Sequence, residues 1–311
     1  METVERLELL NGVITAGNGC WRMARQMLDA LPDHEIDTPC PHTKVSILYA
    51  AVGRLWDILG ADMAPARDQF IHHLIEFRGA GIHTALTPLA LNPDKALAWE
   101  SRASYLSDFC RFQKQGLTMT PLLLAVYLSA NDADLQTWVE RMLLLQPIRG
   151  NAQANKMLYL HKAVGMHTVL DDPYEKPLRF NCKQAKKRTG VVATPPRCLP
   201  QQRVIRALLA AGADRTQLDD DGNTPLSLML SWLTKRKEVV QHCCELIRPL
   251  SMGVDVNRQN SAKRSIVSYL EELIQCDEEV DGSNNAARCI MGHLEIVKLE
   301  NGDREIKWLR G

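Results

Sequence analysis

Two runs in the sequence contain adjacent histidine or cysteine residues, the residue types that bind transition-metal ions. They are His242-Cys243-Cys244-Glu245 and His72-His73. Adjacent cysteines rarely both reach one tetrahedral site, and neighbouring residues on a helix point about 100° apart. Neither run is accompanied by a Cys-x-x-Cys or His-x-x-x-His pair. The spacing therefore favours ordinary helix residues, and we expect no metal site and no cofactor.

Cys182 and Cys198 are the cysteines best placed to react, because both lie in a stretch with few apolar residues and many prolines. Nothing nearby in the sequence marks a catalytic partner for either thiol. Gly-x-Gly-x-x-Gly, Walker, His-Glu-x-x-His and Gly-x-Ser-x-Gly motifs are also missing from the sequence. We therefore expect a protein that is not an enzyme. The alternative is an enzyme or accessory factor with its site in the loop at 166–201 or in the C-terminal tail.

A basic run at 183–188, Lys-Gln-Ala-Lys-Lys-Arg, could act as a nuclear-import peptide or contact an acidic partner. It lies within 171–201, a stretch rich in proline, lysine and arginine that we interpret as a long surface loop. Nucleic-acid binding through 183–188 is a second alternative function. Lys plus Arg and Asp plus Glu both number 37, so the net charge is zero and counts against such binding.

A cluster of turn-forming residues, Asp219-Asp220-Asp221-Gly222-Asn223, separates two helical patterns. Before it, apolar residues recur at helical spacing from Val204 to Leu209, and Gly212 ends that helix. After it, Thr224-Pro225-Leu226 supplies a capping residue, a proline suited to a first helical turn and new apolar surface. The order is therefore helix, glycine, turn and second helix.

This order resembles the junction of two ankyrin repeats, whose Leu-Leu-x-x-Gly-Ala-Asp and Gly-x-Thr-Pro-Leu signatures stand at 208–214 and 222–226. Thr87-Pro88-Leu89 and Thr120-Pro121-Leu122 also lie 33 residues apart, the ankyrin period. The resemblance implies an all-α solenoid of stacked helix-turn-helix units. The expected helices cover 5–30 as a pair, 46–52, 66–77, 104–115, 135–146, 158–164, 202–211, 239–250 and 265–274, and further units open at Thr87, Thr120 and Thr224.

We divide the chain into four parts on this basis: ankyrin-like repeats at 1–170, clearest at 84–146; a Pro/Lys-rich loop insertion at 171–201; further repeats at 202–294; and a tail at 295–311. The tail alternates polar and apolar residues on both sides of Asn301-Gly302, which predicts a short β-hairpin. The segment from His293 to Leu299 also resembles the second helix of a last repeat. Both interpretations of the tail stay open.

The resemblance implies a non-catalytic protein-protein interaction module, such as an adaptor, scaffold or regulatory subunit. Ankyrin proteins bind through a concave face made of the turns, called fingers, and the first helices of the repeats. Carried over by position, the implied protein-binding residues are Arg215, Gln217, Asp219, Asp220, Asn223, Ser227 and Ser231.

Composition indicates an intracellular protein, cytoplasmic or nuclear. The start of the chain lacks the layout of a signal peptide, and no apolar run is long enough to span a membrane. The nine cysteines are scattered and odd in number, which is typical of free thiols in a reducing compartment. We expect a protein partner and no membrane or nucleic acid. The partner's identity and the oligomeric state stay open.

Overall fold

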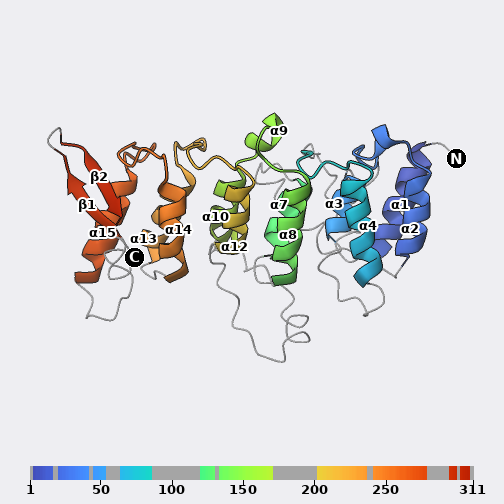
Figure 1. Cartoon of the computed structure of the whole chain (residues 1–311), viewed down its shortest axis with the longest axis horizontal. Helices are drawn as coiled ribbons and strands as arrows, with labels where there is room; N and C mark the ends of the chain where they lie inside the picture. Colours follow the sequence, from blue (N-terminus) through green and yellow to red (C-terminus); the bar gives the residue numbers. More distant parts are fainter. Residues whose placement is uncertain are drawn as a thin grey trace, which may run out of the picture. The chain divides into compact units, whose positions relative to one another are not determined.

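The computed structural model describes residues 3–16, 20–41, 45–53, 64–85, 120–129, 133–170, 202–236, 241–278, 294–299 and 302–308. The chain divides into two units, which we call unit 1 (Met1–Met157) and unit 2 (Leu158–Gly311). Helices predominate in both units (Figure 1). The predicted units at Thr87 and 104–115 and the loop at 171–201 lie outside the described residues.

Unit 1 is built from pairs of helices that pack side by side. In its described part, the pairs are α1 (Thr3–Ala16) with α2 (Trp21–Asp29), α3 (Ile47–Gly53) with α4 (Ala64–Glu76), and α7 (Pro121–Leu128) with α8 (Ala133–Leu145). Helices α1, α3 and α7 pack in sequence as one layer, and α2, α4 and α8 as a second. The connections contain the short 3-10 helix η1 (Asp33–Glu35) and α9 (Ala152–Asn155), neither of which we predicted.

The helices of unit 1 form where apolar residues recur on one face. In α4, Phe70, Ile71, Leu74 and Ile75 share a face at one-four-five spacing, and all four are buried. Helix α3 is buried along its whole length, because it contacts α1, α4 and α7.

Hydroxyl caps begin two of these helices. The Ser46 hydroxyl accepts the Tyr49 amide at 3.2 Å before α3, and the Thr120 hydroxyl accepts the Leu123 amide at 3.1 Å before α7. A side-chain oxygen at this position satisfies an amide that the first turn of a helix leaves unpaired. The predicted start of a unit at Thr120 is therefore the start of a helix in the structure.

Unit 2 has the same two-layer arrangement of helices. The described elements are α10 (Tyr159–Leu170), α12 (Gln202–Ala210), α13 (Pro225–Arg236), α14 (Gln241–Ser251), α15 (Ile266–Glu278), β1 (Leu294–Lys298) and β2 (Arg304–Trp308). Helices α10, α13 and α15 pack in sequence as one layer, and α12 packs on α14 as the second. Each layer contacts the other, through α10 with α12 and α13 with α14.

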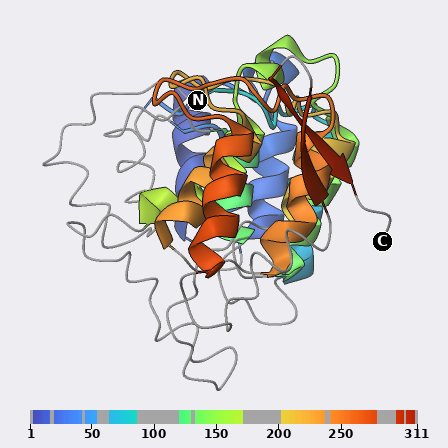
Figure 2. The same ribbon diagram turned by 90° about the vertical axis from the view of Figure 1, so that its left-hand side faces the viewer.

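A two-stranded antiparallel hairpin follows the helices of unit 2, with Ile296 opposite Ile306. It lies beside α15 (Figure 2), to which it is tied by an ion pair between Arg304 and Glu271. The Asn257 side chain also bonds the Arg304 backbone, donating to its carbonyl at 2.7 Å. The predicted hairpin is therefore confirmed, and the alternative of a last repeat helix is wrong for 294–298.

Candidate functional site

Two turns of unit 2 join a helix of one layer to the next helix of the other. We call them finger 1 (213–224, between α12 and α13) and finger 2 (254–265, between α14 and α15). Each follows a glycine with positive φ, Gly212 at 93° and Gly253 at 75°. A left-handed residue lets the chain leave the helix and turn, and glycine adopts it without a steric penalty.

The Asp219 side chain closes finger 1. Its Oδ1 accepts the backbone amides of Asn223 at 2.7 Å and Asp221 at 3.0 Å, and its Oδ2 accepts the Asn223 side-chain amide at 3.1 Å. The Asp219 amide donates to the Asn223 carbonyl, and the Gly222 amide donates to the Asp219 carbonyl, both at 3.0 Å. We predicted that the Asp219 carboxylate faces a partner. In the structure it accepts hydrogen bonds from amides of its own finger, in the place of water.

Finger 2 repeats this hydrogen-bond pattern with a different residue. The Asn260 Oδ1 accepts the amides of Ala262 and Arg264, both at 3.0 Å. Asn260 stands five residues before Ser265, as Asp219 stands five residues before Thr224. The residue with positive φ is Gly222 in finger 1, at 74°, and Lys263 in finger 2, at 58°. Two different sequences therefore build one turn geometry.

Reciprocal caps start the helix after each finger. The Ser227 amide donates to the Thr224 hydroxyl at 3.2 Å, and the Thr224 amide donates to the Ser227 hydroxyl at 2.8 Å. Ser265 and Ser268 make the same two bonds, at 3.2 and 2.9 Å. Ser227 is buried, so this predicted binding residue fixes the start of α13.

The two fingers are joined side by side. Ser261 donates to the Asp221 carbonyl through its amide at 2.9 Å and its hydroxyl at 2.7 Å. The Asn260 Nδ2 donates to Asn223 Oδ1 at 2.7 Å. A Cβ on Gly222 would lie 3.6 Å from the Asn260 Cα, so the backbones run in close contact. The fingers therefore form one hydrogen-bonded edge.

His161 on α10 holds finger 1 from the other side. Its Nε2 donates to the Asn223 carbonyl at 2.8 Å, and its ring is buried. Burial lowers the pKa of His161, while the Asn223 carbonyl and the carboxylates of Asp219 and Asp214 act in the opposite direction. Burial prevails because it disfavours the charged ring, so His161 is neutral at neutral pH.

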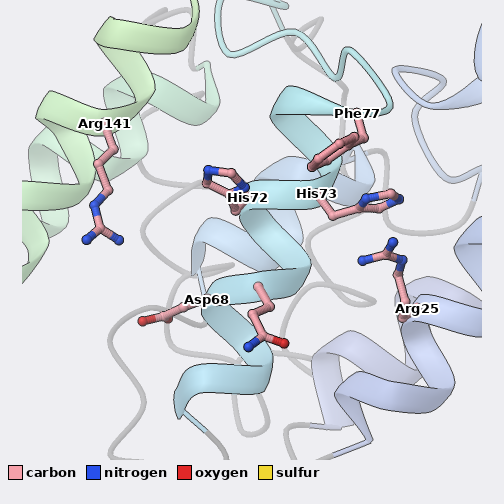
Figure 3. A pocket seen from close by; sticks show the side chains of 7 residues that line it. Arg25, Asp68, His72, His73, Phe77 and Arg141 are labelled. Carbon is pink, nitrogen blue, oxygen red and sulfur yellow. The ribbon is translucent and has the colours of Figure 1, made fainter.

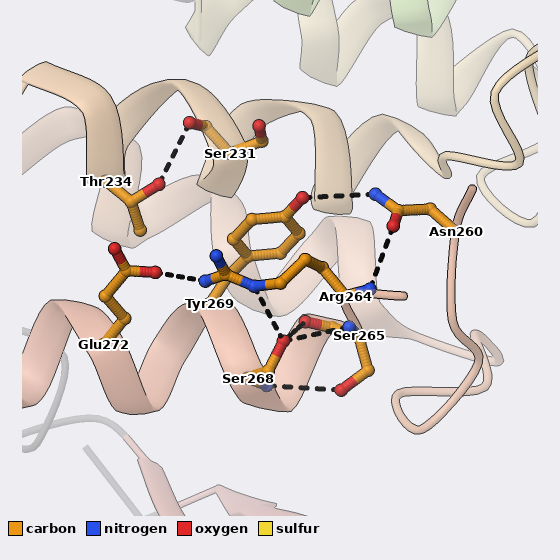
Figure 4. Close-up of polar contacts among 8 residues, drawn as sticks. All are labelled: Ser231, Thr234, Asn260, Arg264, Ser265, Ser268, Tyr269 and Glu272. Carbon is orange, nitrogen blue, oxygen red and sulfur yellow. Dashed lines mark hydrogen bonds and ion pairs between the residues drawn. The ribbon is translucent and has the colours of Figure 1, made fainter. Parts of the chain in front are cut away.

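A group of polar side chains extends from finger 2 over α13 and α15 (Figure 4), and the side chains of Arg264 and Glu272 are 37% and 41% exposed. We call it the polar face. It is formed by Ser231 and Thr234 on α13, Arg264 from finger 2, and Ser268 and Glu272 on α15.

Arg264 is fixed at the centre of this face. Its guanidinium lies 4.5 Å from the ring centre of Tyr269 and pairs with Glu272. Its Nε donates to Ser268 at 3.4 Å. The Tyr269 hydroxyl accepts the Asn260 side-chain amide at 3.1 Å, so the polar face and the fingers share one network.

The predicted binding residues do not all occupy this surface. Asn223 is buried between the fingers, and Arg215 donates from its Nη1 to the Pro249 carbonyl at 2.9 Å. Gln217 and Ser231 are half-buried, whereas Asp220 is exposed. Of the predicted binding residues, Asp220 is therefore the exposed one, and Ser231 belongs to the polar face.

Sequence reasoning missed the finger 2 contribution, which consists of Asn260, Arg264, Tyr269 and Glu272. The sequence contained one indication of finger 2: Asn260 precedes Ser265 by five positions, as Asp219 precedes Thr224. It was hidden because finger 2 lacks the Asp-Gly pair that marks finger 1.

Within the described ranges, no group of three or more His, Cys, Asp or Glu side chains lies close enough together to hold a metal ion. None of the described helices is long and apolar enough to cross a membrane. No family model and no curated protein sequence matches the chain.

Proposed function

We propose that this protein is a non-catalytic protein-interaction module of ankyrin-repeat type, an adaptor, scaffold or regulatory subunit. It binds a protein partner through the polar face and the exposed tips of the fingers. The observation that carries the proposal is the hydrogen-bond pattern shared by the two fingers. Asp219 and Asn260 close equivalent turns, and a capped helix follows each turn. Layered helix pairs joined by such turns, together with the ankyrin-like signatures at 208–226, support the proposal.

Unit 1 supports the same assignment through a backbone bond. In unit 2 the Val267 amide donates to the Val256 carbonyl at 3.3 Å, which ties the start of α15 to its finger. In unit 1 the Leu122 amide donates to the Ile82 carbonyl at 3.1 Å at the start of α7. Repetition of one contact at separate helix starts is typical of an array of similar units.

The polar face has the properties of a protein-binding surface. Arginine contributes much of the binding energy in many interfaces, and here the side chain of Arg264 is 37% exposed and rests on the buried Tyr269 ring. Arg264 is already oriented by Glu272 and Ser268, so docking need not immobilise it. Such pre-organisation reduces the entropy lost on binding.

Affinity capture from the native cell extract tests this proposal. Asp220→Lys and Ser231→Arg change the finger tip and the polar face without touching the bonds that close the fingers. Glu295→Lys makes the same charge change as Asp220→Lys, on exposed strand β1, and serves as the matched control. All three proteins should keep the helical circular dichroism spectrum of the wild type.

We expect that the wild type and the Glu295→Lys control capture a specific protein. Asp220→Lys and Ser231→Arg should both fail to capture it. If Asp220→Lys and Ser231→Arg captured the same proteins as the wild type, the proposal that a partner binds through the polar face and the finger tips would be wrong.

A further inference from the structure

Unit 1 carries an exposed aromatic ring at a site unrelated to the fingers of unit 2. Phe77 follows α4 and is 69% exposed. It borders a recess of about 490 Å³ whose lining comes from α2, α4 and α8 (Figure 3). Arg25 lies on the α2 side, Arg141 on the α8 side, and His72 and His73 on α4 between them.

The Phe77 ring is held in this exposed position. It stacks on the His73 ring, with centroids 5.3 Å apart and planes inclined by 23°. The next residue, Arg78, donates to the Leu28 carbonyl at 2.7 Å and pairs with Asp33 at 2.7 Å. These contacts anchor the backbone beside Phe77 to α2, so the ring offers a fixed apolar surface to a ligand.

His73 adds to the apolar character of the recess. Burial lowers the pKa of His73, and the nearby charge of Arg25 lowers it further, while Asp29 acts in the opposite direction. The imidazole is therefore neutral at neutral pH and stacks on Phe77 as an uncharged ring.

Among the described residues around the recess, one arginine has no carboxylate within ion-pair distance. Arg25 pairs with Asp29 at 3.3 Å, and His72 lies 3.0 Å from Glu76. Asp68 pairs with Arg67 at 2.9 Å.

Arg141 is exposed and stands over the Trp138 ring, 5.6 Å from its centroid. No carboxylate of the described chain lies within ion-pair distance of it. A carboxylate of a bound ligand can therefore pair with Arg141 on α8.

We propose that this recess is a second docking site, which binds a partner's peptide segment carrying an aromatic residue close to an acidic one. The aromatic side chain packs on Phe77 and His73, and the carboxylate pairs with Arg141. The charge complementarity comes from Arg141, and the aromatic preference comes from the fixed Phe77 ring. This site is independent of the function proposed for the polar face, because its residues belong to unit 1 alone.

Fluorine NMR tests the site with defined probes. The full chain is labelled with 4-fluorophenylalanine at its five phenylalanines, and the Phe77 signal is assigned from its absence in Phe77→Leu. The probes are the capped peptides acetyl-Glu-Ala-Phe-amide, acetyl-Lys-Ala-Phe-amide and acetyl-Glu-Ala-Ala-amide, each added at millimolar concentration. Arg141→Gln removes the cation, and Arg149→Gln is the matched control at another exposed arginine of unit 1.

The Phe77 signal should shift in saturable fashion with the Glu-Ala-Phe peptide, and the Lys-Ala-Phe peptide should bind about threefold more weakly, as expected for one exposed ion pair. Arg141→Gln should abolish that preference, and Arg149→Gln should keep it. The Glu-Ala-Ala peptide should leave Phe77 unmoved. Equal binding of the acidic and basic peptides, or no shift at Phe77 with either, would overturn the proposal.

Discussion

The Asn260 side-chain amide donates to the Asn223 carboxamide oxygen at 2.7 Å and joins two fingers that are separate in the sequence. The same Nδ2 also donates to the Tyr269 hydroxyl at 3.1 Å, beside the stacked Arg264. Through its Oδ1, Asn260 closes its own finger. One side chain thus shapes a turn, aligns it with its neighbour and supports the polar face.

Asn260→Ala should destabilise unit 2 by about 2 kcal/mol, because it removes hydrogen bonds on both ends of the carboxamide. Asn260→Asp is the informative companion, since Asp219 closes finger 1 with a carboxylate. The aspartate should retain the acceptor role and cost about 1 kcal/mol. Urea unfolding followed by circular dichroism measures both. Equal losses in the two variants would contradict the division of roles between Oδ1 and Nδ2.

Lys263→Gly should stabilise the protein by about 1 kcal/mol, because a residue with a Cβ is strained at a φ of 58°. Gly222→Ala, at the matching position of finger 1, should destabilise by a similar amount, about 1 kcal/mol. Melting temperatures of the two variants check the pair. If both substitutions shifted the melting temperature in the same direction, the two positions would not be equivalent.

Mild acid should destabilise unit 2 through His161. Burial holds the pKa of this ring below its ordinary 6.5, so the unfolded chain binds more protons below that pH. Stability therefore falls as the pH drops through about 6.5 and levels off below the folded-state pKa.

The test compares wild type with His161→Gln by urea unfolding at about pH 7.5 and about pH 5.5. His161→Gln should lose less stability than the wild type over this interval. His34→Gln, at a side chain 80% exposed, should behave like the wild type. Burial also lowers the pKa of His83, so part of the acid effect should persist in unit 1. An unaltered pH response in His161→Gln would contradict the assignment.

Arg78→Ala should destabilise unit 1 by about 2–3 kcal/mol. The guanidinium is largely buried and reaches the carbonyls of Leu28 and Leu31 at the end of α2, as well as Asp33. Arg149→Ala removes an exposed arginine of the same unit and should change stability by less than about 0.5 kcal/mol. Urea unfolding separates the two outcomes, and comparable small effects would show that the Arg78 contacts contribute little.

Helix positions could be predicted from the sequence because local periodicity determines them. In the predicted helix 135–146, apolar residues recur at helical spacing, and the structure buries them in α8: Trp138, Val139, Met142 and Leu143. The finger 1 turn was also predictable, since Asp-Gly before Thr224 is a strong local signal. These features depend on residues only a few positions apart.

The long-range contacts could not be predicted in the same way. Arg78 follows α4, yet its side chain reaches the Leu28 carbonyl of α2, 50 positions earlier in the sequence. Finger 2 lacks a glycine at its turn, so Lys263 concealed the likeness to finger 1. Whether Arg141 has a carboxylate partner depends on where the fold places the acidic side chains around the recess. Such properties follow from packing of helices that local sequence patterns do not specify.

Site-specific photocrosslinking in the native cells tests the central claim most directly. p-Benzoylphenylalanine is introduced at position 231 on the polar face and, as the control, at position 295 on exposed strand β1. Our account predicts that position 231 crosslinks to a discrete protein partner and that position 295 does not. No crosslinked protein from position 231, or the same products from both positions, would contradict it.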